Sequence, residues 1–230
     1  ALSSAASDVY KRQVVVSIIL VYTSLNICGN LVLYFFRFDV GNEGAYSLFA
    51  AVAFAAQVLV MMVIPLLRKR FSKSQLFISG FIIQIAGFAV ILIMAFAKLY
   101  TPQSWYILCL PGILIYLGYG MLNVIMTIFL SDSVDYGEVM NGTREESVIF
   151  SMQTFTVKLA SGVAVFLAGL VVDWIHLDTA AAVQTQDTLD ALRMWMTIPS
   201  VILLIVGIFV FKRFYKLDDT RMEEIKSKLN

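Results

Sequence analysis

Six apolar segments, each about as long as a membrane-spanning helix, divide this chain of 230 residues. They cover residues 14–36, 45–67, 75–97, 105–131, 147–172 and 194–211. A helix needs about 20 apolar residues to cross the hydrocarbon core of a bilayer, whereas the strands of a β-barrel alternate over about 10 residues. Five of the six segments contain no Asp, Glu, Lys, Arg or His. The sequence therefore predicts an all-α membrane protein whose six transmembrane helices form one bundle.

The basic residues are distributed unevenly between the two sides of the predicted membrane. Because the number of spans is even, both ends of the chain lie on the same side. Thirteen of the 17 Lys and Arg residues fall on that side, while Arg37, Lys98 and Arg193 fall on the other and Lys158 lies within a span. The positive-inside rule places the side richer in Lys and Arg in the cytoplasm. We therefore expect a multi-pass protein with both ends cytoplasmic.

Lys158 lies near the middle of the fifth apolar segment, which contains no other charge between residues 147 and 172. An ammonium at bilayer depth is costly, so it indicates a functional site whose partner has to be found. Polar residues recur every three or four positions around it and share one helical face: Ser147, Ser151, Thr154, Lys158 and Ser161. A row of small residues suits close helix packing: Ala160, Ala164 and Ala168.

Two other segments carry a polar stripe at helical spacing. The first has Thr23, Asn26, Asn30 and Tyr34, and the fourth has Tyr116, Tyr119, Asn123 and Thr127. Three helices with polar faces could line the cavity of a transporter, but such groups also hydrogen-bond one helix to another. For Asn26 and Asn30 the spacing leaves both interpretations open. For the fifth segment the lysine favours a role in function.

Several classes of site are not expected in this chain. Cys28 and Cys109 lie within apolar segments, and His176 has no Cys or second His near it, so no metal site is predicted. No basic stripe with interleaved aromatic residues indicates nucleic acid. Asp132 and Asp135 could form an acid–base pair, but no nucleophile, metal set or phosphate loop accompanies them. We therefore expect neither an enzyme nor a bound cofactor.

A specific motif joins the end of the fourth segment to the fifth. Residues 132–162 read DSVDYGEVMNGTREESVIFSMQTFTVKLASG. This stretch resembles the helix 10–11 region of the glycoside–pentoside–hexuronide:cation symporters, which belong to the major facilitator superfamily. Their pattern is an Asp-x-Val-Asp-Tyr-Gly-Glu loop, a basic residue and then a Lys in helix 11. The six-span layout extends the resemblance to nearly the whole chain.

The resemblance implies a major facilitator fold in which the six segments are helices 7–12, the C-terminal bundle. Residues 14–214 would form this bundle and residues 215–230 a cytoplasmic tail, while the polar composition of residues 1–13 indicates a linker or a non-native leader. It also implies symport of a glycoside, pentoside or hexuronide with Na⁺ or H⁺ by alternating access in the bacterial inner membrane. The expected partners are the sugar, the cation, the lipid bilayer and an N-terminal six-helix bundle, which would bind most of the cation.

The resemblance also points to individual residues. It matches Lys158 to the helix 11 lysine near the sugar and cation sites, and Gln153 and Thr154 to a neighbouring polar pair. Gln153 lies about 140° from Lys158 on an ideal helix, so only Thr154 shares its face. Asn123 stands where one family member has tryptophan, which leaves the sugar open. The substrate-binding residues that we expect are Lys158, Thr154, Gln153, Asn123, Tyr119, Asn26 and Asn30.

A charged segment follows the fourth span, with five ionisable residues that match the family's cytoplasmic loop: Asp132, Asp135, Glu138, Arg144 and Glu146. In the family such loops pair with the N-terminal bundle when the inner gate is closed, and ordinary solvated loop charges are the alternative.

Two rival functions also stay open. One is a transporter of lysolipids or another organic solute from the same superfamily, with the lysine against a zwitterionic headgroup. The other is an assembly subunit without a substrate.

Overall fold

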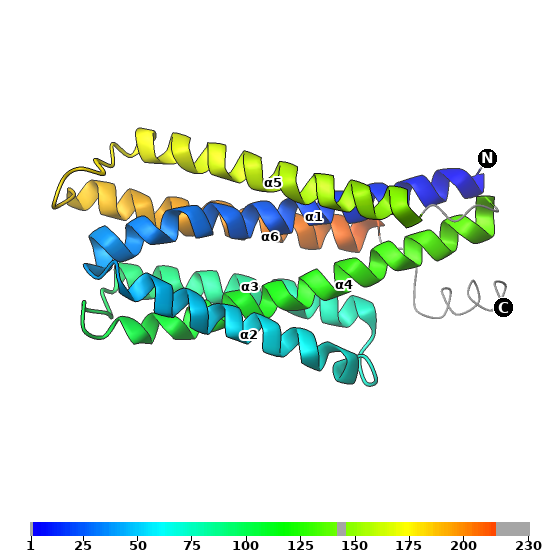
Figure 1. Ribbon diagram of the computed structural model, residues 1–230, viewed down its shortest axis with the longest axis horizontal. Helices are drawn as coiled ribbons and strands as arrows, with labels where there is room; N and C mark the ends of the chain where they lie inside the picture. The colour runs from blue at the N-terminus through cyan, green and yellow to red at the C-terminus, as the bar shows by residue number, and fades with distance from the viewer. Residues whose placement is uncertain (1, 142–145, 215–230) are drawn as a thin grey trace.

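The computed structural model describes residues 2–141 and 146–214, which form six long helices and two short helical segments (Figure 1). In chain order they are α1 (Leu2–Tyr34), the π-helix η1 (Phe35–Val40), α2 (Ala45–Leu67), α3 (Lys73–Phe96), the 3₁₀-helix η2 (Trp105–Leu108), α4 (Cys109–Asn141), α5 (Glu146–Trp174) and α6 (Gln186–Phe214). Each of the six long helices contains a stretch long and apolar enough to cross a membrane. The predicted all-α fold class is therefore confirmed.

The helices extend beyond the apolar segments from which we predicted them. Helix α1 begins at Leu2 and not at Val14, α4 continues to Asn141 and α6 begins at Gln186. Apolar residues mark the part of a helix that lies in lipid, whereas backbone hydrogen bonds also form along polar flanks. Residues 2–13, which we expected as a linker or leader, are thus continuous with the first span. The predicted tail 215–230 lies outside the described residues.

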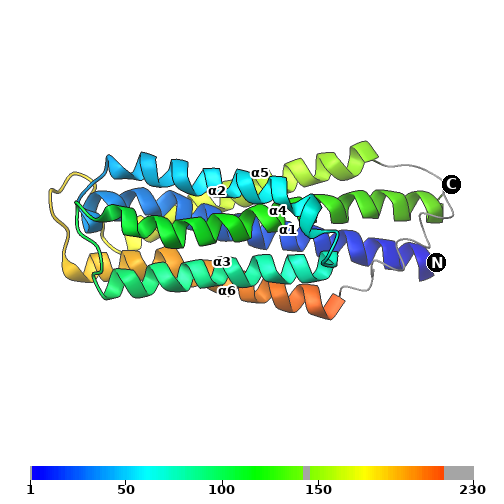
Figure 2. The same cartoon turned by 90° about the horizontal axis from the view of Figure 1, so that it is seen from below.

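The bundle consists of two groups of three helices. Helices α5 and α6 both pack on α1, and α2 and α3 both pack on α4. The groups meet where α1 contacts α4 and where α3 contacts α6. Figures 1 and 2 show α1 and α4 running side by side through the middle of the molecule. The two polar stripes predicted on the first and fourth segments are therefore carried by neighbouring helices.

Small residues set the closest helix contacts. A Cβ atom added to Gly118 of α4 would lie 2.6 Å from the backbone oxygen of Gly80 and the backbone nitrogen of Gln84, both on α3. Such a close approach of two backbones is possible only without side chains between them. On α5 the predicted row of alanines is buried: Ala160, Ala164 and Ala168. Since α1 is the main neighbour of α5, this row allows the two helices to approach closely.

The bundle has two ends, which differ in charge. The near end holds the start of α1, the turn between α2 and α3, and the last turn of α6, with Arg68, Lys69, Arg70, Lys212 and Arg213. The far end holds η1 and the segments 97–104 and 175–185, with Arg37 and Lys98. At the near end Ser72 caps α3, and Ser72 and Gln75 form a reciprocal capping box. That the near end is cytoplasmic stays a prediction from the positive-inside rule.

Candidate functional site

A cluster of tyrosine and asparagine side chains joins the middle of α1 to the middle of α4. The Asn123 amide donates a hydrogen bond to the Tyr22 hydroxyl at 2.7 Å. The Tyr22 ring meets the Tyr119 ring edge to face at 5.6 Å, and Tyr116 continues the row at 6.5 Å from Tyr119. Tyr119 is buried, whereas Tyr22, Tyr116 and Asn123 are half-buried. The cluster thus combines aromatic surface with a positioned amide, the two kinds of group that bind sugars.

Tyr22 was not among the residues predicted from the sequence. We had grouped Thr23 with Asn26 and Asn30, but Thr23 is buried and its hydroxyl makes no hydrogen bond among the described residues. Positions 22, 26 and 30 are spaced by four, so the sequence also allowed a polar stripe that contains Tyr22 in place of Thr23. The structure supports it, because Asn26 donates to the backbone oxygen of Tyr22 and Asn30 to that of Asn26, each at 2.7 Å. In both bonds the amide nitrogen is the donor, so the side-chain oxygens of Asn26 and Asn30 take no part in them.

Lys158 lies on an exposed face of α5, together with the polar residues of its predicted stripe. Ser147, Ser151 and Thr154 are exposed, and Ser161 is half-buried. Within the described part of the chain, Lys158 makes no hydrogen bond and no ion pair. A lysine at this depth requires a partner or access to water. Its environment therefore depends on whatever lies against this face of α5 in the bilayer.

The other two candidates on α5 differ in orientation. The Thr154 hydroxyl is exposed and donates to the backbone oxygen of Phe150 at 3.0 Å. Gln153 is half-buried, which agrees with its distance of about 140° from Lys158 around the helix. In the described residues no hydrogen bond links the α5 candidates to the cluster on α1 and α4. The structure thus brings together Asn26, Tyr119 and Asn123 around Tyr22 and leaves Lys158 and Thr154 as a separate row.

A buried ion pair lies at the near end, between α3 and α4. Lys73 and Asp132, 5% and 2% exposed, meet at 2.5 Å. Asp132 was expected in a loop that pairs with another bundle, but α4 continues past it and its charge is balanced by a lysine of the same bundle. Lys73 was missed because its partner is distant in sequence. Asp135 and Glu138 are half-buried on α4, Glu146 is exposed, and Arg144 lies outside the described residues.

The far end holds a second buried ionic cluster, which the sequence did not indicate. Arg193 of α6, 2% exposed, donates to both carboxylate oxygens of Asp39 in η1, at 2.8 and 2.5 Å. It also donates to Asp190 at 2.6 Å, and the Tyr100 hydroxyl donates to Asp39 at 2.6 Å. Burial and this hydrogen bond raise the pKa of Tyr100 above its usual range, so the phenol remains a donor at alkaline pH values where an exposed tyrosine ionises. We had expected Arg193 in an outer loop.

No grouping of side chains in the described residues is suited to a metal ion. Cys28 and Cys109 are both free thiols within the spans. Near mid-span, the polar side chains of the described residues on α1, α4 and α5 are amides, hydroxyls, phenols and the exposed Lys158. This set can bind an uncharged polyhydroxylated molecule by hydrogen bonds and ring contacts, or an anion at the lysine.

A membrane-spanning helical bundle with polar faces on three helices is an arrangement that the class of secondary transporters shares. The chain belongs to a family in that class, described as MFS/sugar transport protein, which matches residues 2–219. This confirms the family that the motif at residues 132–162 indicated.

Several relatives are similar over most of this chain. An uncharacterized symporter, YjmB, from Bacillus subtilis is 26% identical over 208 residues, 90% of this chain and 44% of the relative. The isoprimeverose transporter of Lactiplantibacillus pentosus is 26% identical over 187 residues, 80% of this chain and 37% of the relative. The raffinose carrier protein of Pediococcus pentosaceus is 21% identical over 207 residues, 89% and 31% respectively. The chain thus spans less than half the length of each of these relatives.

Proposed function

We propose that this chain is the C-terminal six-helix bundle of a secondary transporter that moves a sugar together with Na⁺ or H⁺. Family membership supports transport of a sugar, and relatives named for isoprimeverose and raffinose support a glycoside as the class of substrate. The observation that carries the proposal for this chain is Lys158, an exposed lysine at mid-span with no partner in the described residues. A lysine in that position is expected to bind a ligand or to pair with a charge on another part of the transporter.

The proposed sugar site lies between the polar stripe of α5 and the cluster on α1 and α4. Tyr22 and Tyr119 supply ring surface, Asn123 and the amides of Asn26 and Asn30 supply hydrogen bonds, and Thr154 and Gln153 extend the site on α5. Lys158 donates to a sugar hydroxyl when substrate is bound, and pairs with a carboxylate of the N-terminal bundle when it is not. This exchange of partners would couple occupancy by sugar to occupancy by the cation.

The charged residues that follow the fourth span in the sequence form the proposed inner gate. Asp135, Glu138, Arg144 and Glu146 would pair with the N-terminal bundle when the cavity is closed on that side. Asp132 contributes indirectly, because its pair with Lys73 ties the start of α3 to α4. Alternating access would then rock this bundle as one unit against its partner.

The test is gradient-driven sugar uptake in cells that express the complete protein containing this chain. Removing the charge by Lys158→Met should lower uptake by about 10- to 100-fold, since a hydrogen bond to a charged group contributes about 1.5–3 kcal/mol. Lys158→Arg, which keeps the charge, should retain part of the activity. The matched control is Lys98→Met, which removes an exposed lysine at the far end and should leave uptake unchanged.

Three results would contradict the proposal. Full coupled uptake by Lys158→Met would remove the role given to the lysine. Absence of sugar uptake together with uptake of a lysolipid would favour the alternative substrate class of the same superfamily. If the protein transports neither substrate, and Lys158→Leu leaves its function in the cell unchanged, the result would favour an assembly subunit.

A further inference from the structure

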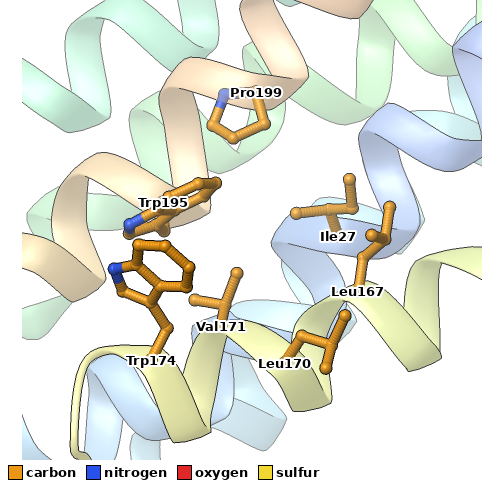
Figure 3. A pocket seen from close by; sticks show the side chains of 7 residues that line it. All are labelled: Ile27, Leu167, Leu170, Val171, Trp174, Trp195 and Pro199. Atoms are coloured by element: carbon orange, nitrogen blue, oxygen red, sulfur yellow. The ribbon is translucent and has the colours of Figure 1, made fainter.

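An apolar groove runs along the outside of the bundle at the far end, where α5 and α6 diverge. Both helices pack on α1 but make few contacts with each other, so a strip of α1 is left between them. Two adjoining hollows of about 230 and 500 Å³ share Ile27, Leu167, Trp195 and Pro199. Figure 3 shows Ile27 and Leu167 on one side of the hollow and the rings of Trp174 and Trp195 on the other. We propose that this groove binds one acyl chain of a bilayer phospholipid.

The walls of the groove exclude a polar ligand. Every lining side chain is an aliphatic group, an indole or the thioether of Met194, and α1, α5 and α6 each have the length and apolarity to span the membrane. The indole nitrogens of Trp174 and Trp195 lie on the side of the rings away from Ile27 and Leu167 (Figure 3). The ring carbons thus face the hollow, while the N–H donors lie at its outer end. An acyl chain with a polar headgroup at one end matches this arrangement.

The depth of the groove fits one leaflet of a bilayer. On α6 it extends from Met194 to Leu203, nine steps along the helix or about 14 Å at 1.5 Å per residue. On α5 it extends from Leu167 to Trp174, or about 11 Å. Half of a hydrocarbon core of about 30 Å is about 15 Å. Trp174, the last residue of α5, is 77% exposed, as expected of an aromatic anchor at headgroup level.

The direction of the groove argues against another protein segment as its occupant. On α5 the groove residues Leu167, Leu170 and Trp174 lie between about 120° and 180° from Lys158 around the helix. A partner bundle that faces Lys158 would therefore lie on the opposite side of α5. The groove side therefore faces lipid. The inference depends on the location of these helices in the membrane and not on the transport of a sugar.

Photolabelling in the complete protein tests the proposal. The protein would be reconstituted in vesicles of phosphatidylcholine that carries a diazirine midway along one acyl chain, and the adducts would be located by mass spectrometry. We expect residues 167–174 and 194–203 to be labelled at least severalfold more than Ile205 and Phe209, which are exposed on the same helix outside the groove. Excess unlabelled phosphatidylcholine should lower the labelling slowly, as bound lipid exchanges.

Variants that fill the groove provide the second arm. Ile198→Trp places a bulky ring in the groove from an exposed position, and Leu170→Trp does so from the opposite wall. Both should reduce labelling of the groove severalfold, whereas Ile205→Trp should not. Equal labelling of the groove and Phe209 would overturn the proposal. Unchanged labelling in the filled variants would do the same, as would protection of the groove by a second copy or another segment, detected as a protein–protein crosslink.

Discussion

At the scale of single residues, the charge of Arg193 is balanced in the core by Asp39, on a helix 154 positions away in the chain. We predict that Asp39→Asn lowers the free energy of unfolding by about 3 kcal/mol, because the buried guanidinium then keeps only Asp190, a more exposed carboxylate, as its charged partner. A thermal melt of the purified protein would measure this. The control is Glu43→Gln, whose pair with Arg37 is exposed and 3.6 Å long, so at most about 1 kcal/mol should be lost. Equal effects of the two variants would contradict the prediction.

Also at the residue scale, Tyr22 is expected to act on the sugar partly through Asn123. Tyr22→Phe removes the hydroxyl that accepts from the amide, and should weaken sugar binding about 3- to 10-fold, since such a bond contributes roughly 1 kcal/mol. Tyr116→Phe, in the same cluster but without a hydroxyl hydrogen bond in the described residues, should have little effect. If Tyr22 positions Asn123, the Phe substitution should add nothing in an Asn123→Ala background. Additive losses in equilibrium sugar binding would show that the two side chains act separately.

At the scale of elements, the contact between α3 and α4 depends on the absence of side chains. We predict that Gly118→Ala destabilises the protein by roughly 2 kcal/mol, because its Cβ atom would meet backbone atoms of α3 that cannot move aside. Gly162→Ala on α5 is the matched control, since no atom lies within 4 Å of the added methyl group. That variant should be neutral or slightly more stable, because alanine favours helices over glycine. Two similar melting temperatures would argue against a tight α3–α4 contact.

The elements also show which features a sequence can predict. Apolar length located all six spans. Spacing grouped Lys158 with the other polar residues of one α5 face, which is mostly exposed, and grouped Ala164 with the small residues of another face, which is buried. These are local properties of one helix. Helix ends were less accurate, since α4 continues beyond residue 131 into a polar segment that is partly buried. The pairs of Lys73 with Asp132 and of Asp39 with Arg193 depend on which helices are neighbours, and no periodicity within one helix contains that information.

At the scale of the whole molecule, one end of the bundle carries more Lys and Arg residues than the other. This asymmetry predicts the orientation of the bundle in the membrane. The turn with Arg68, Lys69 and Arg70 should face the cytoplasm, and the far-end segment containing Thr179 should face outward. In a background without Cys28 and Cys109, Phe71→Cys should react only with a membrane-permeant maleimide in intact cells. Thr179→Cys should react with an impermeant one, since Thr179 is exposed. The reverse labelling pattern would show that the predicted orientation is wrong. The proposed gate at Asp135 and Glu138 would then lie on the outer side of the membrane.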